Sequence, residues 1–548
     1  MKKICFVAAG LAAATPIIVS AQDTGGALEE VVVTAQRREQ NLQDVPISIT
    51  AFSGAQLEKS NVKGAVDYLV QTPNVSFTED AQSGSRGLGI SVRGVNNLVS
   101  GENAFVNSVG IYLDEFSVAS VPNGVSNPFL PDMERVEVLR GPQGTYFGRN
   151  SLGGALNIVT HAPTDKYEGR ITVGGESYST TGDMFNFAGV FNAPVSDAFR
   201  VRGVAFYEHS SGMVKNTNPA GADTGHDWIN LRLRAEWQVS DSTKLGFTAI
   251  YAHEDQGADE TVPSGVLDLD TVDTFGFQPG TAFDPGTGFY PDNQDKLSHD
   301  LDEQNKLRTT IGIVNFAHSF SDTLTWKAVA GIIDSKQDRL FDNDLIGNLD
   351  LLARTNRYKG KSWSLESRLE SRSDAVDWVV GAMYAKDDQD QFNDVAISTD
   401  PTATIDGVGF LPPFPEGLGL ALNTKSFHVD SIAAFADATW HASERVDLIA
   451  GARYTKDKVT NTRTSYGIAP SCGCGPGDPA FFPSFVNFVR PDAIDNDRSF
   501  DDVTPRVGIR YKWSDRVSLY ATISKGYKAG GASTGNDTNT GGSPAIVI

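Results

Sequence analysis

Most of the chain alternates between apolar and polar residues in segments of strand length. In the clearest one, Ile229 to Val239, apolar side chains hold the odd-numbered positions and polar or charged ones the even-numbered positions. A strand turns successive side chains to opposite faces, so this period of two predicts one apolar and one polar face. Trp363–Arg372 and Val507–Trp513 repeat the scheme. From about residue 163 onward roughly thirteen such segments follow, each near the ten residues of a membrane-crossing strand.

The connections between these segments favour a membrane barrel over a soluble sandwich, whose strands also alternate. Short turns recur at Ser196-Asp197, Ser240-Asp241, Ser321-Asp322, Ser373-Asp374, Ser443-Glu444 and Ser514-Asp515. Longer connections are expected at Glu254 to Gln304, Asp387 to Lys425 and Lys458 to Ser499. Alternation of short and long connections is typical of an outer-membrane barrel with short periplasmic turns, and charges on the second face fit a water-filled lumen.

Tryptophan placement agrees with a membrane interface. Five of the seven Trp residues lie within a few residues of a short turn: Trp237, Trp326, Trp378, Trp440 and Trp513. An aromatic girdle at one membrane surface explains this clustering. Placement in a protein core by chance is the alternative explanation.

The part before residue 163 has a different pattern. Val45 to His161 predicts one compact α/β unit, with a helix starting near Ser53, a second near Val62, and short strands separated by glycine-rich turns. Upstream, Glu29 to Ala35 predicts an extended strand with no obvious local partner. It is either a buried edge strand or a mobile segment that pairs with another protein's sheet, and the sequence leaves both readings open.

Composition narrows the class of protein. The 548 residues include 46 basic and 68 acidic ones, a net charge of −22, so a nucleic-acid partner is not expected. A 40% hydrophobic content excludes a disordered chain. Lys2 and Lys3, the apolar stretch that follows and the small residues before Gln22 predict a signal peptide over residues 1–21, and therefore export.

Motifs for catalysis or metal binding are weak. Cys472 and Cys474 form one Cys-x-Cys without a nearby His, which favours a local disulfide or two free thiols over a metal site. No phosphate-binding Walker motif occurs, and no Ser–His–Asp set can be assembled from spacing. Acidic loop residues such as Asp268 and Asp270 fit solvated carboxylates better than a calcium site. We therefore expect no enzymatic activity, no cofactor and no metal, and a secreted β-rich hydrolase is disfavoured.

One long motif is specific enough to identify a family. Residues 134–160, beginning Glu-Arg-Val-Glu-Val-Leu-Arg-Gly-Pro-Gln-Gly, resemble the plug-domain signature of TonB-dependent outer-membrane receptors. Shorter similarities lie at Ser91–Gly94, Val109–Asp114 and Tyr520–Gly531. Glu30 to Ala35 resembles the TonB box, the segment that the periplasmic protein TonB binds in that family.

The resemblance implies a fold and a division of the chain. An antiparallel barrel of the 22-stranded type is expected to hold a small N-terminal α/β plug domain in its lumen. The expected segments are 22–44 as a periplasmic stretch with the TonB box, 45–161 as the plug and 162–548 as barrel. Roughly thirteen strands against about 22, and a glycine-rich tail after Gly531, lead us to expect an incomplete barrel, from a fragment or a decayed gene.

The resemblance also assigns roles to residues. The expected TonB-binding residues are Glu30, Val31, Val32, Val33, Thr34 and Ala35. The expected plug-motif residues are Arg93, Gly94, Arg135, Glu137, Arg140, Gly141, Gly144, Gly148, Arg149, Gly153 and Gly154. The expected ligand-binding residues, chosen by position alone, are Arg86, Leu88, Asn96, Asn97 and Asn103. We further expect the four plug-motif arginines to meet lumen carboxylates such as Glu366 and Glu370.

The function that follows is energy-coupled uptake of a scarce ligand at the bacterial outer membrane. Its expected partners are TonB, with ExbB and ExbD, outer-membrane lipid and a small ligand. A ferric siderophore is the first expectation, and cobalamin, an oligosaccharide or an aromatic compound are alternatives. A passive porin would not need the plug, a signalling receptor would need a further domain before the TonB box, and a truncated chain would be non-functional.

Overall fold

The computed structural model describes most of the chain between residues 32 and 528. Within these limits the described part omits residues 35, 39, 61, 63, 80–87, 97–107, 119–130, 179–181, 261–294, 300, 343–351, 398–403, 406–407, 410–418, 471–484, 489–493 and 515–516. Predictions that fall outside the described residues are those for the signal peptide 1–21, Glu30, Val31, Ala35, Arg86, Asn97, Asn103, Asp268, Asp270, Cys472 and Cys474.

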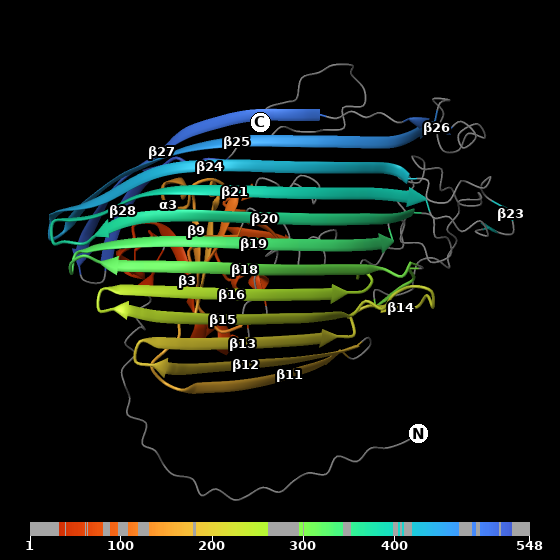
Figure 1. Ribbon diagram of the computed structural model, residues 1–548, viewed down its shortest axis with the longest axis horizontal. Helices are drawn as coiled ribbons and strands as arrows, with labels where there is room; N and C mark the ends of the chain where they lie inside the picture. The colour runs from red at the N-terminus through yellow and green to blue at the C-terminus, as the bar shows by residue number, and fades with distance from the viewer. Residues whose placement is uncertain are drawn as a thin grey trace, which may run out of the picture.

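The larger part of the molecule is one curved antiparallel sheet. Thirteen strands follow one another in chain order, each paired with the next (Figure 1). They are β11 (Glu168–Tyr178), β12 (Gly182–Ser196), β13 (Phe199–Ser210), β15 (His226–Ser240), β16 (Thr243–Gln256), β18 (Gln304–Ser319), β19 (Leu324–Asp342), β20 (Leu352–Ser371), β21 (Val376–Ile397), β24 (Gly419–Ser443), β25 (Val446–Pro470), β27 (Ile494–Ser514) and β28 (Val517–Ser524). Among the described residues β11 and β28 each pair with a single neighbour.

Short strands lie at the end of this sheet that carries the long connections. They are β14 (Lys215–Asn216) with β17 (Lys296–Leu297), β22 (Thr404–Ile405) with β23 (Val408–Gly409), and β26 (Phe485–Phe488) beside β25. No helix among the described residues has the length and apolar character needed to cross a bilayer.

Several strands are longer than predicted. β24 and β25 have 25 residues each and β21 has 22, against about ten for a tilted membrane crossing. The extra residues come from the segments expected as the loops Asp387–Lys425 and Lys458–Ser499, and that part of the prediction is wrong. Alternation of apolar and polar residues is weaker there, because a strand that extends beyond a membrane has water on both sides.

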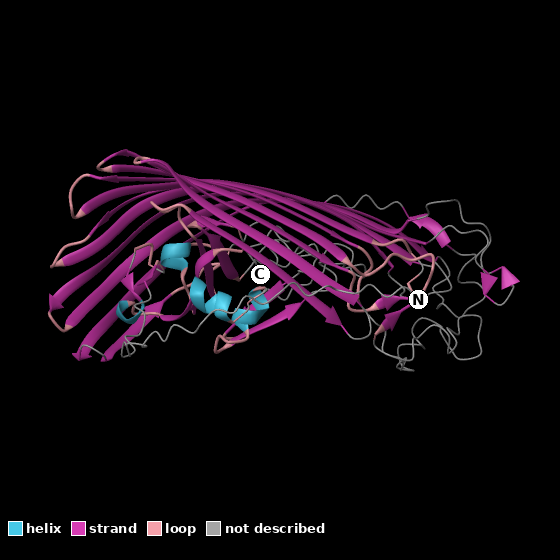
Figure 2. Ribbon diagram, turned by 90° about the horizontal axis from the view of Figure 1, so that it is seen from below, coloured by secondary structure: helices cyan, strands magenta, loops and turns pink. Residues whose placement is uncertain are grey.

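The second unit is a small α/β domain, here called the plug, in the hollow of the sheet (Figure 2). Its central sheet has the order β3-β9-β10-β7-β8, with only β10 and β7 parallel. Its elements are β3 (Ser48–Ser53), α1 (Gly54–Lys59), α2 (Ala65–Leu69), β4 (Val75–Glu79), β5 (Leu88–Val92), β6 (Val95–Asn96), β7 (Val109–Leu113), β8 (Phe116–Ser117), β9 (Met133–Arg140), α3 (Gly144–Phe147) and β10 (Gly154–Thr160). The predicted fold class, an antiparallel barrel-type sheet around an α/β plug, is confirmed.

Local sequence explains the start of α1. The Ser53 hydroxyl caps the helix by accepting a hydrogen bond from the backbone N–H of Gln56. In return, the backbone N–H of Ser53 donates to the side-chain oxygen of Gln56. This capping box satisfies two of the N–H groups that every helix start leaves without partners. The helix predicted to start near Ser53 is therefore present and begins at Gly54.

Glycines close the turns beside β9 and β10. Gly141 follows β9 with φ at +95°, in the left-handed region that glycine adopts without strain. At Gly154 the constraint is space, because an added Cβ would lie 2.2 Å from the carbonyl oxygen of Leu139 on the neighbouring strand. Steric constraints therefore explain why the plug motif has glycine at both positions.

The plug and the sheet share an apolar core. Phe116 and Val118 of the plug pack in one buried cluster with Ile250, Ile313 and Val329 from the inner face of the sheet. The sequence predicted a charged inner face, and this patch over β16, β18 and β19 departs from it. Contact with the plug excludes water there, so apolar side chains are favoured.

Candidate functional site

The segment beside the expected TonB box lies docked against the plug. β1 (Val32–Val33) pairs antiparallel with β2 (Gln40–Asn41), so the expectation that this strand lacks a local partner is wrong. The Val33 side chain is fully buried and packs in a cluster with Tyr112 and Leu139. This structure therefore shows the buried reading of the segment, while its pairing with another protein stays a prediction.

A buried carboxylate of the plug motif holds the residue that follows β1. Glu137 on β9 accepts a hydrogen bond of 2.8 Å from the backbone N–H of Thr34. The same side chain accepts bonds from Arg135 at 2.9 Å and Asn157 at 3.0 Å. A buried carboxylate is stable only with such donors, so docking of the segment helps to satisfy Glu137.

Two arginines just after β1 connect the same segment to the wall of the sheet. Arg37 forms an ion pair of 3.3 Å with Glu366 on β20 and donates a 3.0 Å hydrogen bond to the backbone oxygen of Glu115. Arg38 reaches Asp437 on β24 at 3.5 Å. Neither arginine was assigned a role from the sequence. Two adjacent arginines directly after an apolar run were the available signal.

Asp437 also receives a contact from the plug. The hydroxyl of Tyr146, on α3, donates to Asp437 and accepts a 2.7 Å bond from Arg506 on β27. Burial is the main cause that raises the pKa of Tyr146, so this hydroxyl keeps its proton and remains a donor. One wall carboxylate thus joins the N-terminal segment, the plug and a second wall strand.

Glu115, between β7 and β8, makes a comparable junction. Its carboxylate accepts a 2.6 Å hydrogen bond from Arg368 on β20. Burial alone would raise the pKa of Glu115, but the positive charges of Arg368, Arg37 and Lys327 outweigh burial and hold it below its ordinary value of 4.5. The group is therefore charged at neutral pH and binds the plug to the wall electrostatically.

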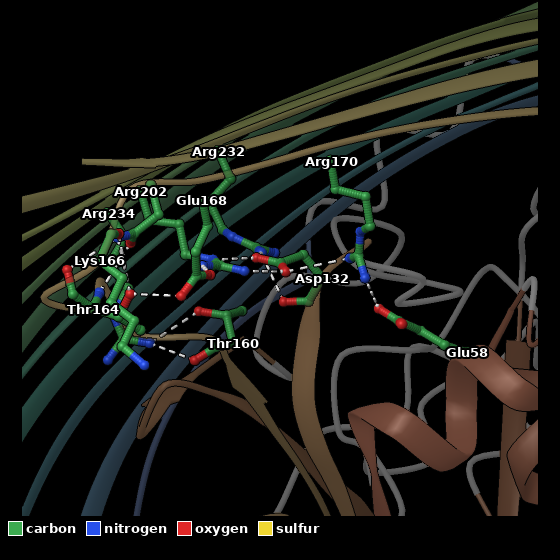
Figure 3. A network of polar contacts seen from close by, with 11 residues as sticks. Glu58, Asp132, Thr160, Thr164, Lys166, Glu168, Arg170, Arg202, Arg232 and Arg234 are labelled. Carbon is green, nitrogen blue, oxygen red and sulfur yellow. Dashed lines mark hydrogen bonds and ion pairs between the residues drawn. The ribbon is translucent and has the colours of Figure 1, made fainter. Parts of the chain in front are cut away.

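On the opposite side of the plug, arginines of the first wall strands converge on Asp132 (Figure 3). Arg202 of β13 binds both carboxylate oxygens at 2.7 Å, and Arg232 of β15 binds one oxygen at 3.1 Å and the backbone carbonyl at 2.9 Å. Arg170 of β11 lies 3.6 Å away and also pairs with Glu58 of α1. Bidentate guanidinium–carboxylate pairs are among the stronger polar contacts, so this cluster anchors the plug.

Arg234 extends this cluster to the end of β10 (Figure 3). It donates at 2.6 Å to the backbone oxygen of Thr160 and lies 3.5 Å from Asp114. Asp114 in turn accepts bonds from the backbone and hydroxyl of Thr160. The last strand of the plug, after which the chain continues into β11, is thereby fixed to β15.

The predicted arginine contacts are confirmed for one residue. Arg149 pairs with a wall carboxylate, although its partner is Asp387 on β21. The prediction is wrong for Arg135, which contacts Glu134 and Glu137 within the plug, and for Arg140, which donates to the Pro73 backbone. The carboxylates expected as their partners pair instead with cations outside the motif: Glu366 with Arg37 and Arg368, and Glu370 with Lys327.

The structure describes only two of the expected ligand-binding residues. Leu88 lies in β5 and Asn96 in β6, which belong to the small plug sheet β4-β5-β6. The others lie outside the described residues, so ligand binding at these positions stays a prediction. Within the described residues no group of three His, Cys, Asp or Glu side chains is arranged to hold a metal ion.

Comparison with known proteins gives two family matches. A model of the TonB dependent receptor-like beta-barrel matches residues 252–547, more than half of the chain. A model of the TonB-dependent receptor plug domain matches residues 41–155.

Individual relatives are more distant. The vitamin B12 transporter BtuB of Vibrio vulnificus is 32% identical over 179 residues, 30% of this chain and 28% of its own. The pesticin receptor of Yersinia pestis is 24% identical over 528 residues, 94% of this chain and 66% of its own. The solved structure of the ferric yersiniabactin uptake receptor FyuA from Yersinia pestis has a TM-score of 0.69 at 19% identity, covering 92% of this chain and 67% of that one. Fold, site geometry and family matches agree that this chain belongs to the TonB-dependent receptor family of the bacterial outer membrane.

Proposed function

We propose that this protein serves in energy-coupled uptake of a scarce ligand, driven by TonB together with ExbB and ExbD. One observation carries the proposal: the segment beside the expected TonB box is docked by groups of both plug and wall. Thr34 bonds to Glu137 of the plug, whereas Arg37 and Arg38 pair with wall carboxylates. A pull on residues 30–35 therefore acts directly on contacts that seat the plug, which is the coupling that such a receptor needs.

A ferric siderophore is the proposed ligand. The similar solved structures include the ferric yersiniabactin uptake receptor, which matches over 92% of this chain. Cobalamin is the second candidate, because a vitamin B12 transporter matches at higher identity, although over only 30% of this chain. The longer match supports the siderophore first.

Deletion of residues 30–35 from the gene in its host tests the coupling. We expect cells with the deletion to bind the ligand at the surface but to lose its uptake, because every residue of the plug and of the sheet from residue 45 onward is retained while TonB has no segment to bind. Deletion of six residues further upstream, Gln22–Ala27, is the matched control and should leave uptake intact. Normal uptake by the 30–35 deletion would overturn the proposal.

The ligand is tested separately from the coupling. Iron-starved cells with and without the gene are compared for uptake of a panel of ⁵⁵Fe-siderophores and of ⁵⁷Co-cyanocobalamin. Loss of one iron complex on gene deletion supports the siderophore. Loss of cobalamin uptake alone selects the second candidate and rejects the first.

A further inference from the structure

The outward face of the sheet carries a row of three cations on adjacent strands. Arg308 of β18 lies directly opposite Lys336 of β19, which lies opposite Lys359 of β20. All three side chains are exposed. Directly opposed residues in an antiparallel pair have Cβ atoms about 5 Å apart, and like charges in such positions repel each other.

The acidic residues around this cationic row pair with other groups. In the row above it, Asp255 forms an ion pair with Lys306 at 3.9 Å, and Asp338 forms one with Arg357 at 3.8 Å. Asp334 lies opposite Lys361 in the row below, and Asp390, opposite Lys359, accepts a bond from Ser426. Within the described part of the chain, Arg308, Lys336 and Lys359 form no ion pair within 4 Å. The row is therefore a concentrated positive charge open to an external anion.

An apolar groove lies on the same strands, one outward-facing row further from the cations than the row that contains Asp334 and Lys361. It has a volume of about 600 Å³, and its lining includes the small residues Ala249 and Gly312 and the larger Phe247, Ile332, Trp363 and Leu365. Ala249, Gly312, Ile332 and Trp363 lie opposite one another in a single cross-strand row. Small residues between large ones make the depression.

The distance along the strands between the cationic row and the groove suits a lipid, which has a charged headgroup and apolar chains. Gly312, Ile332 and Trp363 each lie four residues from the cation on their own strand, which is about 13 Å along the strand. Trp326, next to a short periplasmic turn, is ten residues from Lys336, or about 33 Å. At the usual strand tilt this corresponds to about 25 Å of height, the thickness of the apolar band of such barrels. The cationic row therefore lies at the outer surface of the membrane and the groove within its hydrocarbon.

We propose that this face of β16, β18, β19 and β20 binds a phosphorylated, multiply acylated lipid of the outer leaflet. Its phosphates lie on Arg308, Lys336 and Lys359, and one acyl chain fills the groove. Three cations over about 10 Å fit a headgroup with more than one phosphate better than a phospholipid with a single phosphate. The proposal needs only the outer-membrane location, and it is independent of the transported ligand.

The first test uses the triple variant R308Q/K336Q/K359Q of the full chain in nanodiscs, with diphosphoryl lipid A as the probe. We expect affinity for lipid A to fall at least about tenfold, because the charge-assisted contacts to phosphate are removed. The matched control R445Q/K456Q/K458Q removes the same charge from the short turn before β25 and from the outward face of β25, and should bind like the parent. Equal affinity of both triple variants and the parent would overturn the proposal.

A second variant keeps the test valid if the triple variant folds poorly. A249L/G312L fills the groove without changing charge, and we expect weaker lipid A binding, whereas A434L on the outward face of β24 should have no effect. Unchanged binding by A249L/G312L would contradict the role of the groove. Competition by phosphatidylglycerol as effective as that of lipid A would show a general anionic-lipid surface and reject the proposed ligand.

Discussion

At the scale of single residues, buried charges decide how plug and wall are joined. Asp132, Glu115 and Asp437 each collect guanidinium groups from two or more segments. Removing one partner from such a cluster leaves a buried charge uncompensated, which costs more than the intact pair contributes. These residues are therefore sensitive positions, although an ion pair of this kind is not in itself strong evidence for stability.

Asp132 offers the sharpest test. In Asp132→Asn the buried guanidiniums of Arg202 and Arg232 lose their shared negative partner, and we expect a loss of about 3–5 kcal/mol in plug docking. Hydrogen exchange of the β9 amides measures this loss. Glu58→Gln is the control, since its pair with Arg170 is half-exposed and contributes no more than about 1 kcal/mol. Similar exchange in both variants would show that Asp132 does not anchor the plug.

The lowered pKa of Glu115 predicts that the stability of the protein depends on pH. Its pKa is lower in the folded protein than its ordinary value of 4.5, so its contribution to stability is complete above pH 4.5 and is lost as pH falls through the folded pKa. Thermal unfolding between pH 7 and pH 3 should therefore show a steeper acid decline in the parent than in Glu115→Gln, which cannot titrate. Parallel pH profiles for the two proteins would contradict this assignment.

At the scale of elements, the close approach of strands and plug depends on small residues. β8 of the plug meets β19 at Gly331, where an added Cβ would lie 2.2 Å from the Phe116 ring. The alternating pattern of β19 specifies which residues face inward or outward, but it contains no information about the ring on the other side. Such contacts couple an element of the plug to one particular wall strand.

Gly331→Ala should therefore disturb docking of β8. We expect a cost of about 1–3 kcal/mol, typical of overpacking in a close-packed interior, because Phe116 must move. Gly169→Ala is the matched control, since a Cβ at Gly169 meets nothing within 4 Å. Thermal unfolding midpoints compare the two variants, and equal midpoints would mean that the contact at Gly331 relaxes freely.

At the scale of the whole molecule, one curved sheet separates two environments. Its outward side shows exposed apolar residues such as Leu233, Val314 and Leu365, and its hollow contains the plug and most of the buried charges. This arrangement is inverted relative to a soluble protein, because lipid replaces water on the outside. Charge is therefore tolerated inside and disfavoured on the outer band.

The depth of a residue within the apolar outer band predicts how much a charge placed there destabilises the protein. Leu233→Arg lies near the middle of β15 and should cost about 2–4 kcal/mol, whereas Val239→Arg, on the same face beside a short turn, should cost about 0–1 kcal/mol. Denaturant unfolding in lipid vesicles measures both. Equal costs would contradict a membrane-facing role for this side of β15.

The strand pattern, the α/β unit before it and the family can all be recognised from the sequence alone. Alternation with a period of two is a local property that needs no knowledge of distant contacts, and the motif of residues 134–160 is contiguous. The same reasoning placed Arg149 against a wall carboxylate, although Asp387 was not among the examples given, and it was wrong for Arg135 and Arg140. Charge complementarity limits the possible partners of an arginine without specifying which of many acids lies within reach.

Contacts between residues that are distant in sequence, in contrast, follow from the folded arrangement of plug and sheet. Arg37 contacts Glu366 across 329 positions of sequence, and Arg38 contacts Asp437 across 399. The position of the plug inside the sheet creates these pairs, as well as the apolar patch on the inner face and the cationic row outside. Strand register sets the last of these, because it aligns Arg308, Lys336 and Lys359 on three strands that are separate in sequence. Alternation shows which face a residue occupies, whereas only register and docking show what lies beside it.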